Sequence, residues 1–168
     1  YSFDRLAIAS GGTLYYYDGT TLHLQSVTDA DMGAVLDVAW LGGYFITTDG
    51  TSIVVTELND PTSINPLKYG SAESDPDPIK AIAAMNDELY AFGRYSIEAV
   101  RTVGGDFSPS QRIDGARVSK GIAGTHAYCP AAGTFAFVGS GRNEAPGCYL
   151  MAPGACPKFS TREIDQIL

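Results

Sequence analysis

The side chains best suited to chemistry in this sequence are a histidine and three cysteines in its C-terminal half. His126 and Cys129 lie three residues apart, and Cys148 and Cys156 follow. Imidazole and thiolate groups can bind zinc, and a cysteine beside a histidine can act as a nucleophile. Because the spacing matches no zinc finger, we expect no metal site, no catalytic site and no cofactor. The odd cysteine count also indicates a reducing compartment rather than a disulfide framework.

Carboxylates are the second group to consider, because a pair of them can hydrolyse a glycosidic bond. Asp37 and the turn residues Asp18 and Asp49 are the candidates. Asp18 and Asp49 each precede a glycine, and Asp-Gly is typical of a tight hairpin turn, so both are explained without catalysis. The sequence also contains no phosphate-binding loop of the Walker type and no nucleophile elbow. It therefore predicts a protein that is not an enzyme.

The charge balance and hydrophobicity exclude other classes of protein. The 168 residues include 11 Lys and Arg against 19 Asp and Glu, which gives a net charge of −8. Binding to nucleic acid depends mainly on basic side chains that meet phosphates, so we expect no specific nucleic-acid binding. No apolar run reaches the roughly 18 residues that a membrane span needs. With 45% hydrophobic residues the chain is expected to form a packed domain and not a disordered tail.

The elements that must position these residues form a repeat of short apolar runs joined by tight turns. The runs of residues 6–27 are separated by Gly-Gly and Asp-Gly, and those of residues 35–58 by the same pairs. The third unit, residues 79–101, has Asn86-Asp87 at the first turn, and a looser fourth unit begins at residue 121. Such pairs favour the left-handed conformation that two-residue antiparallel hairpins need. The middle strands align at Leu14, Phe45, Leu89 and Phe135.

Each unit is predicted to be a small antiparallel sheet that is buried on both faces. Ile53 and Val55 face opposite to Val54, so apolar groups lie on both sides of one strand. Units of about 45 residues with this property are typical of β-propeller blades. The fold class is therefore all-β, a β-propeller-like domain over residues 1–168 with blades of three to four antiparallel strands. The blades are predicted at residues 1–30, 35–58, 79–103 and 121–152, an incomplete ring of about three and a half to four blades.

Two long connectors, residues 59–78 and 104–120, are expected to lack regular strands and to contact partners. The first contains four prolines, which oppose strand formation. Connectors of such length tend to be functional or interface segments. The candidate interface residues are Asn59, Asp60, Pro61, Tyr69, Glu73, Asp75, Asp77, Arg112, Arg117 and Lys120. Arg101, Arg112, Arg117 and Lys120 form either a functional basic edge or an ordinary solvated loop.

Two features outside the connectors carry expectations of their own. Residues 159–168 fit either a short helix capped by Ser160 or Thr161 or the outer strand of a further blade. Trp40, at the end of a predicted strand, is expected in the core rather than as a platform for a ligand.

Several segments resemble the phage stabilisation protein family, the packaged DNA stabilisation or tail hub proteins of short-tailed phages and prophages. The matching segments are the acidic connector from Ala72 to Asp77, Ser96-Ile97-Glu98, and the run from Lys120 to Thr125. The resemblance covers about residues 35–168. Members of the family are longer, so we expect further blades after Leu168.

The resemblance implies a structural protein of the virion, assembled in the host cytoplasm. Such a protein would form a head-to-tail hub that closes the portal channel and stabilises packaged DNA. Its implied partners are other tail or portal-adaptor proteins and further copies of itself.

Two alternatives are open to the sequence. One is a scaffold or receptor-binding propeller that engages a host protein or glycan, which a rim of exposed Tyr15, Tyr17 and Tyr44 would support. The other is a propeller glycoside hydrolase.

Overall fold

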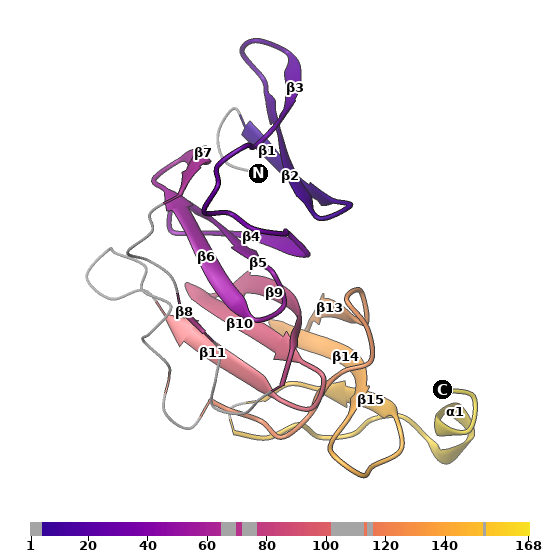
Figure 1. Ribbon diagram of the computed structural model, residues 1–168. Coiled ribbons are helices and arrows are strands. Elements are labelled where there is room, and N and C mark those ends of the chain that lie inside the picture. The colour runs from indigo at the N-terminus through magenta and orange to yellow at the C-terminus, as the bar shows by residue number, and fades with distance from the viewer. Residues whose placement is uncertain (1–4, 65–69, 72–76, 102–112, 114–115, 153) are drawn as a thin grey trace.

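The computed structural model describes residues 5–64, 70–71, 77–101, 113, 116–152 and 154–168. Four antiparallel sheets follow one another along the chain (Figure 1). The first contains β1 (Arg5–Ser10), β2 (Thr13–Asp18) and β3 (His23–Ser26). The second contains β4 (Asp37–Leu41), β5 (Tyr44–Thr48), β6 (Ser52–Glu57), β7 (Asp60–Ile64) and the two-residue β8 (Gly70–Ser71).

The C-terminal half contributes the other two sheets. The third contains β9 (Ile79–Met85), β10 (Glu88–Gly93) and β11 (Ile97–Arg101). The fourth contains β12 (Gly121–Ile122), β13 (Tyr128–Ala131), β14 (Thr134–Ser140) and β15 (Gly147–Leu150). An all-β fold of antiparallel sheets is thus confirmed.

Turns with left-handed backbone join the first two long strands of every sheet. Gly11-Gly12 and Gly42-Gly43 have positive φ, and Asn86 and Asp87 adopt φ of 53° and 61°. Ala132 and Gly133 take the same role between β13 and β14, at φ of 52° and 74°. A turn with both central residues in this region matches the twist of the strands that it joins. The predicted role of Asn86-Asp87 is therefore confirmed.

The sheets pack face to face, with one apolar layer between each successive pair. Val54 packs toward the first sheet, whereas Ile53 and Val55 pack toward the third. The third sheet also has two buried faces, because Ile82 lies in the layer shared with the second sheet and Phe92 in the layer shared with the fourth. Burial on both sides explains why polar residues do not alternate regularly with apolar ones along these strands.

The expectation that residues 59–78 contain no regular strand is wrong in the part that the structure describes. β7 runs antiparallel to β6 despite Pro61, and β8 pairs with a different part of β6. The pairing of β7 is irregular: Glu57 opposes Asp60 and Thr56 opposes Ile64, with a register shift between them. An edge strand at a bulge tolerates proline because it needs no hydrogen bond from the missing N–H.

The C-terminal segment contains a short helix, α1 (Arg162–Asp165), so the helical alternative is the one observed. Thr161 occupies the N-cap position, but no side chain caps the helix, so the predicted cap is wrong. The Ser160 hydroxyl instead donates a hydrogen bond to the Asp165 carboxylate (2.5 Å). Lys158 forms an ion pair with the same carboxylate (2.5 Å) and connects this segment to β15, beside which it lies. In the described part of the chain, no helix has the length and hydrophobicity to cross a membrane.

Candidate assembly surfaces

The start of the first connector joins two sheets. The Arg5 guanidinium on β1 donates to the Asn59 carbonyl and to the Asp60 carboxylate, both at 3.2 Å. Burial opposes ionisation of Asp60, but hydrogen bonds from Thr62 and the nearby Arg5 charge outweigh it and hold the pKa of the carboxyl below its ordinary value. Pro61 is buried. Of the predicted interface residues, these three therefore have a role within the chain.

The end of the same connector is fixed to the third sheet through Asp77. Its carboxylate accepts hydrogen bonds from the Arg94 amide (3.1 Å), the Tyr95 amide (2.7 Å) and the Ser96 hydroxyl (2.9 Å). These three residues form the turn between β10 and β11. Asp77 thus holds this turn in one conformation.

Lys120, at the end of the second connector, lies beside the same turn. Its ammonium group forms an ion pair with Glu144 and lies 5.4 Å from the ring centroid of Tyr149. The hydrogen bond from Lys120 lowers the pKa of Glu144. Gly121, the next residue, packs directly against the backbone of Arg94 and Tyr95.

The remaining predicted residues are dispersed or undescribed. Arg117 is exposed, next to Val118, which pairs with Ile97. Arg101 lies at the opposite end of β11, across from Glu88, so a single basic edge that contains both Arg101 and Lys120 does not form. Tyr69, Glu73, Asp75 and Arg112 lie outside the described residues.

The structure reveals an aromatic group that the sequence reasoning missed. Tyr95 is 36% exposed, and the guanidinium carbons of Arg94 and Arg142 lie 5.1 Å and 5.8 Å from the centroid of its ring. We refer to Arg94, Tyr95, Lys120, Arg142 and Glu144 as the Tyr95 rim. The adjacent Arg94 and Tyr95 in a short turn are only a weak sequence signal of a binding surface. Nothing in the sequence indicates that Arg142 lies beside them.

The histidine and the three cysteines considered above as metal ligands or nucleophiles do not form a reactive centre among the described residues. His126, Cys129 and Cys148 line one shallow pocket of about 320 Å³. Cys129 and Cys148 are on different strands that flank β14, and both are free thiols. Burial raises the pKa of the Cys156 thiol to about 11, which leaves it protonated and unreactive at neutral pH. Among the described residues no group of three His, Cys, Asp or Glu side chains is arranged to hold a metal.

The three candidate carboxylates serve as hydrogen-bond acceptors. Asp18 accepts from the Thr20 amide and Asp49 from the Thr51 amide, as expected for turn residues. Asp37 accepts from the amides of Val38 and Ile82, both at 2.9 Å, and so connects β4 to β9. Burial raises the pKa of Asp37, whereas these hydrogen bonds and the charge of His126 act in the opposite direction.

The burial of Tyr44 and of Trp40 also differs from the prediction. Tyr44 is buried in the layer between the second and third sheets, so an exposed rim of Tyr15, Tyr17 and Tyr44 does not form. Trp40, expected in the core, is 40% exposed. It lies across from Phe45 at the end of β4, and its neighbour Leu41 takes the buried position instead.

A cavity of about 740 Å³ lies between the third and fourth sheets. The β9–β10 and β13–β14 turns line it, together with Met151 and Ile113. Its polar groups include Glu88, whose carboxylate accepts a 2.5 Å hydrogen bond from the Tyr90 hydroxyl. Burial and this bond raise the pKa of Tyr90 well above its ordinary value, so the hydroxyl remains a donor. Glu88 is the carboxylate among the described residues that line this cavity.

Comparison with known proteins gives matches to a family model and to a curated relative. A family model described as the bacteriophage P22 Gp10 β-propeller matches residues 1–168. The chain is 32% identical over 180 residues to the tail hub protein gp10 of Salmonella phage P22, with 96% of the chain aligned. It spans 37% of the length of that relative.

Solved structures share the fold at low sequence identity. U3-55K superposes with a TM-score of 0.61 and 11% identity, covering 93% of this chain and 48% of its own. The WD40 repeats of RRP9 give a TM-score of 0.55 and 13% identity, over 93% and 47% of the two chains. The designed protein Ika4 gives 0.53 and 13%, over 90% and 88%. These similarities show a propeller-type fold.

Proposed function

The chain belongs to the phage stabilisation family, that of the bacteriophage P22 Gp10 β-propeller, and we propose that it is part of a structural tail hub protein of a virion. The observation that carries the proposal is the family match over all 168 residues, together with the identity to a tail hub protein. The architecture suits the role, because sheets that pack face to face form a rigid wall. The carboxylates that could catalyse hydrolysis hold turns and strands together, which supports a function without catalysis.

In its finer form the proposal is that the hub closes the portal channel and stabilises packaged DNA. Its proposed partners are further copies of itself and other tail or portal-adaptor proteins, and it would join the virion in the host cytoplasm. A chain with a net charge of −8 repels the phosphate backbone. Its contribution to DNA retention would therefore be mechanical, by obstructing the exit, and would not depend on DNA binding.

The experiment is complementation of a phage that lacks its own copy of the full-length protein. Filled heads would be assembled without the protein, with the wild-type protein, or with a variant whose core is disrupted at Phe92. We expect wild-type protein to restore genomes that resist nuclease, and the Phe92→Ala protein to restore far fewer. Equal protection of the genome in particles that lack the protein would overturn the proposed role.

A further inference from the structure

β3 forms the outer edge of the first sheet, and all four of its residues are exposed. In each of the other three sheets a further segment pairs with the equivalent strand. The pairs are β7 and β8 with β6, Val118 with Ile97 on β11, and Lys158 with Tyr149 on β15. In the described part of the chain, the first sheet lacks such an outer segment. An unpaired edge of this kind is a template on which another strand can add.

The residues that follow β3 are engaged elsewhere and do not supply this strand. The Val27 amide donates a hydrogen bond to the Leu14 carbonyl at 2.8 Å, and the Val35 amide donates to the Gly12 carbonyl at 2.9 Å. Val35 is buried in the apolar layer between the first and second sheets. Residues 27–35 thus fold against the inner face of the first sheet, and they leave the outer edge of β3 open.

The hydrogen-bonding groups at this open edge belong to Leu24 and Ser26. The bond from Val27 to Leu14 continues the register of β3 on β2 and makes these two residues a hydrogen-bonded pair. Hydrogen-bonded and non-bonded pairs alternate along an antiparallel ladder, so Leu24 and Ser26 fall in non-bonded pairs with β2. Their N–H and C=O groups therefore point away from β2, toward solvent.

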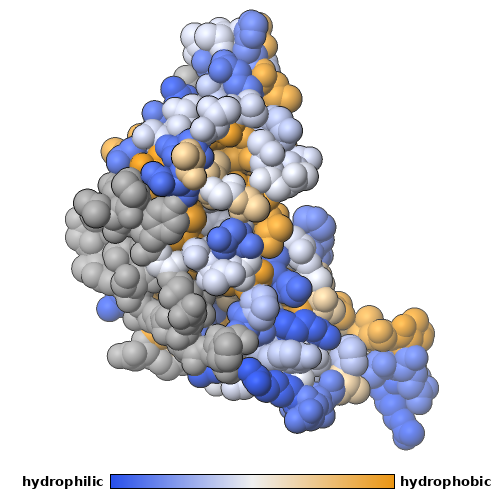
Figure 2. Space-filling model, viewed as in Figure 1, coloured by the Kyte–Doolittle hydropathy of each residue, from blue (hydrophilic) through white to orange (hydrophobic). Residues whose placement is uncertain are grey.

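An apolar face lies beside the open edge. Leu6, Tyr17 and Leu24 lie directly opposite one another across β1, β2 and β3, and Ile8 and Tyr15 form the next row. Leu6 is 44% exposed and Leu24 is 59% exposed. Figure 2 shows hydrophobic side chains along the upper right margin of the molecule, where β3 lies in Figure 1. A strand added at β3 would place its own side chains next to these rows and extend them.

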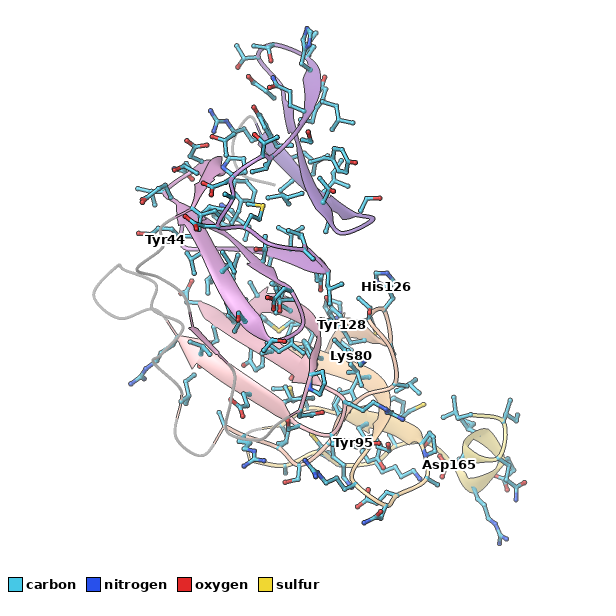
Figure 3. All side chains as sticks on the ribbon, in the orientation of Figure 1. Tyr44, Lys80, Tyr95, His126, Tyr128 and Asp165 are labelled. Atoms are coloured by element: carbon cyan, nitrogen blue, oxygen red, sulfur yellow. The ribbon has the colours of Figure 1, made fainter. Side chains whose placement is uncertain are left out.

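Charge indicates which kind of strand this edge favours. Residues 1–64 contain eight Asp and Glu but one Arg, for a net charge of −7. That arginine, Arg5, forms an ion pair with Asp60. Figure 3 shows the first sheet at the upper end of the molecule and the labelled Tyr95 of the Tyr95 rim in its lower part. The acidic first and second sheets therefore attract a basic segment, and they repel the same acidic region of a second copy.

We propose that β3 is a strand-addition site, at which an extended segment of a different virion protein pairs with the backbone of Leu24 and Ser26 as a fourth strand of the first sheet. The segment carries apolar side chains at alternate positions, which extend the row of Leu6, Tyr17 and Leu24, and lysine or arginine between them. The proposal deepens the hub role proposed above and rests on it, because it names the surface that holds one partner and the chemistry of that partner.

The test uses the full-length protein and a dye-labelled peptide of about eight residues in which valine and lysine alternate. Every second amide of the peptide is N-methylated, so that the peptide pairs through one edge and does not form sheets with itself. Fluorescence anisotropy should show saturable binding in about 50 mM salt, with affinity at least about tenfold weaker in about 500 mM salt. A peptide in which glutamate replaces every lysine should not bind.

Variants of β3 separate backbone pairing from other kinds of contact. Ser26→Pro should weaken binding of the peptide at least about tenfold, because it removes an outward N–H and its ring occupies the place of the added strand. Ser26→Ala is the matched control, which keeps the backbone donor and should bind as wild type does. Leu24→Lys keeps the backbone but repels the lysines of the peptide, and it should also weaken binding. Thermal unfolding verifies that each variant is folded, and Leu24→Lys decides the test where Ser26→Pro is not.

Equal binding of the peptide by wild type and by folded Ser26→Pro would overturn the proposal, because the backbone edge of β3 would then take no part. Failure of wild type to bind the peptide would also overturn it, since the edge would then be closed by the rest of the polypeptide or by a second copy. Neither result depends on genome retention in particles, so failure here is distinguishable from failure of the hub role.

Discussion

The aspartates of this protein act mainly on its own backbone. Asp18, Asp29, Asp49 and Asp77 each accept a hydrogen bond from a main-chain amide in a turn or a neighbouring segment. Carboxylates in that role hold loops in place because charge-assisted hydrogen bonds are stronger than neutral ones. The acidic composition thus contributes to local structure as well as to net charge.

Replacing Asp77 by alanine should lower the free energy of unfolding by about 2–3 kcal/mol. The turn then loses three hydrogen bonds to this carboxylate, two of them donated by backbone amides. The measurement is the urea midpoint of unfolding. Asp77→Asn keeps one acceptor oxygen and should lose less. Equal stability of the alanine variant and wild type would show that the turn does not depend on this carboxylate.

The pH dependence of stability should reveal Asp37. Burial raises its pKa in the folded chain above the ordinary 3.8, so ionisation is less favourable in the folded state than in the unfolded state. Its contribution to stability is complete below pH 3.8 and is lost as the pH rises through the folded-state pKa. His126 and Tyr128 are the charged and titratable groups that interact with it.

Unfolding free energies of wild type and Asp37→Asn, measured from pH 3 to pH 7, isolate this contribution because the amide does not titrate. The difference, wild type minus variant, should fall with rising pH. A difference that is constant or that rises with pH would contradict the effect of burial.

At the scale of elements, the fourth sheet depends on close backbone contact between two strands. Gly139 on β14 pairs with Ile122 on β12, and a Cβ at this glycine would overlap the Gly121 carbonyl. Glycine is therefore required here because of space and not because of its backbone angles.

Gly139→Ala should cost about 1–3 kcal/mol, as overpacking forces β12 away from β14. Gly124→Ala is the matched control, since no atom lies within 4 Å of a Cβ at that position. Thermal unfolding of both variants gives the comparison. Equal melting temperatures would mean that β12 moves without cost.

At the scale of the whole molecule, the sheets differ in how much of their surface is covered. The third sheet is buried on both faces, whereas all four residues of β3 are exposed, among them Leu24 at 59%. Leu6 and Ile8 on β1 are also exposed, so one face of the first sheet has no apolar layer over it within the described residues.

Hydrogen exchange should therefore be faster in the first sheet. Opening it breaks one apolar layer, but opening the third sheet breaks two. Mass spectrometry of exchanged peptides should show amides of β1–β3 exchanging at least about tenfold faster than those of β9–β11. Equal protection of the two sheets would indicate that the chain unfolds as one unit.

Local patterns in the sequence were sufficient to predict the all-β class and the turns between the long strands. Asn86-Asp87 specifies a left-handed turn by its own conformational preferences, and the alternation of Ile53, Val54 and Val55 places side chains on opposite faces whatever the neighbours are. Pro61 shows the limit of such patterns. Proline opposes a central strand, but only the tertiary structure shows that β7 lies at an edge, where its missing donor has no cost.

The surfaces depended on contacts between distant residues. Arg142 reaches the ring of Tyr95 from 47 positions along the chain, and Asp37 bonds to Ile82 in the next sheet. A period of two residues defines which face a side chain occupies, but the stacking of one sheet on another decides which residues meet there. The sequence alone thus determined most of the strands, the turns between them and the family, because these depend on local patterns, and the tertiary structure alone decided which distant charges are engaged within the chain, because that depends on how the sheets stack.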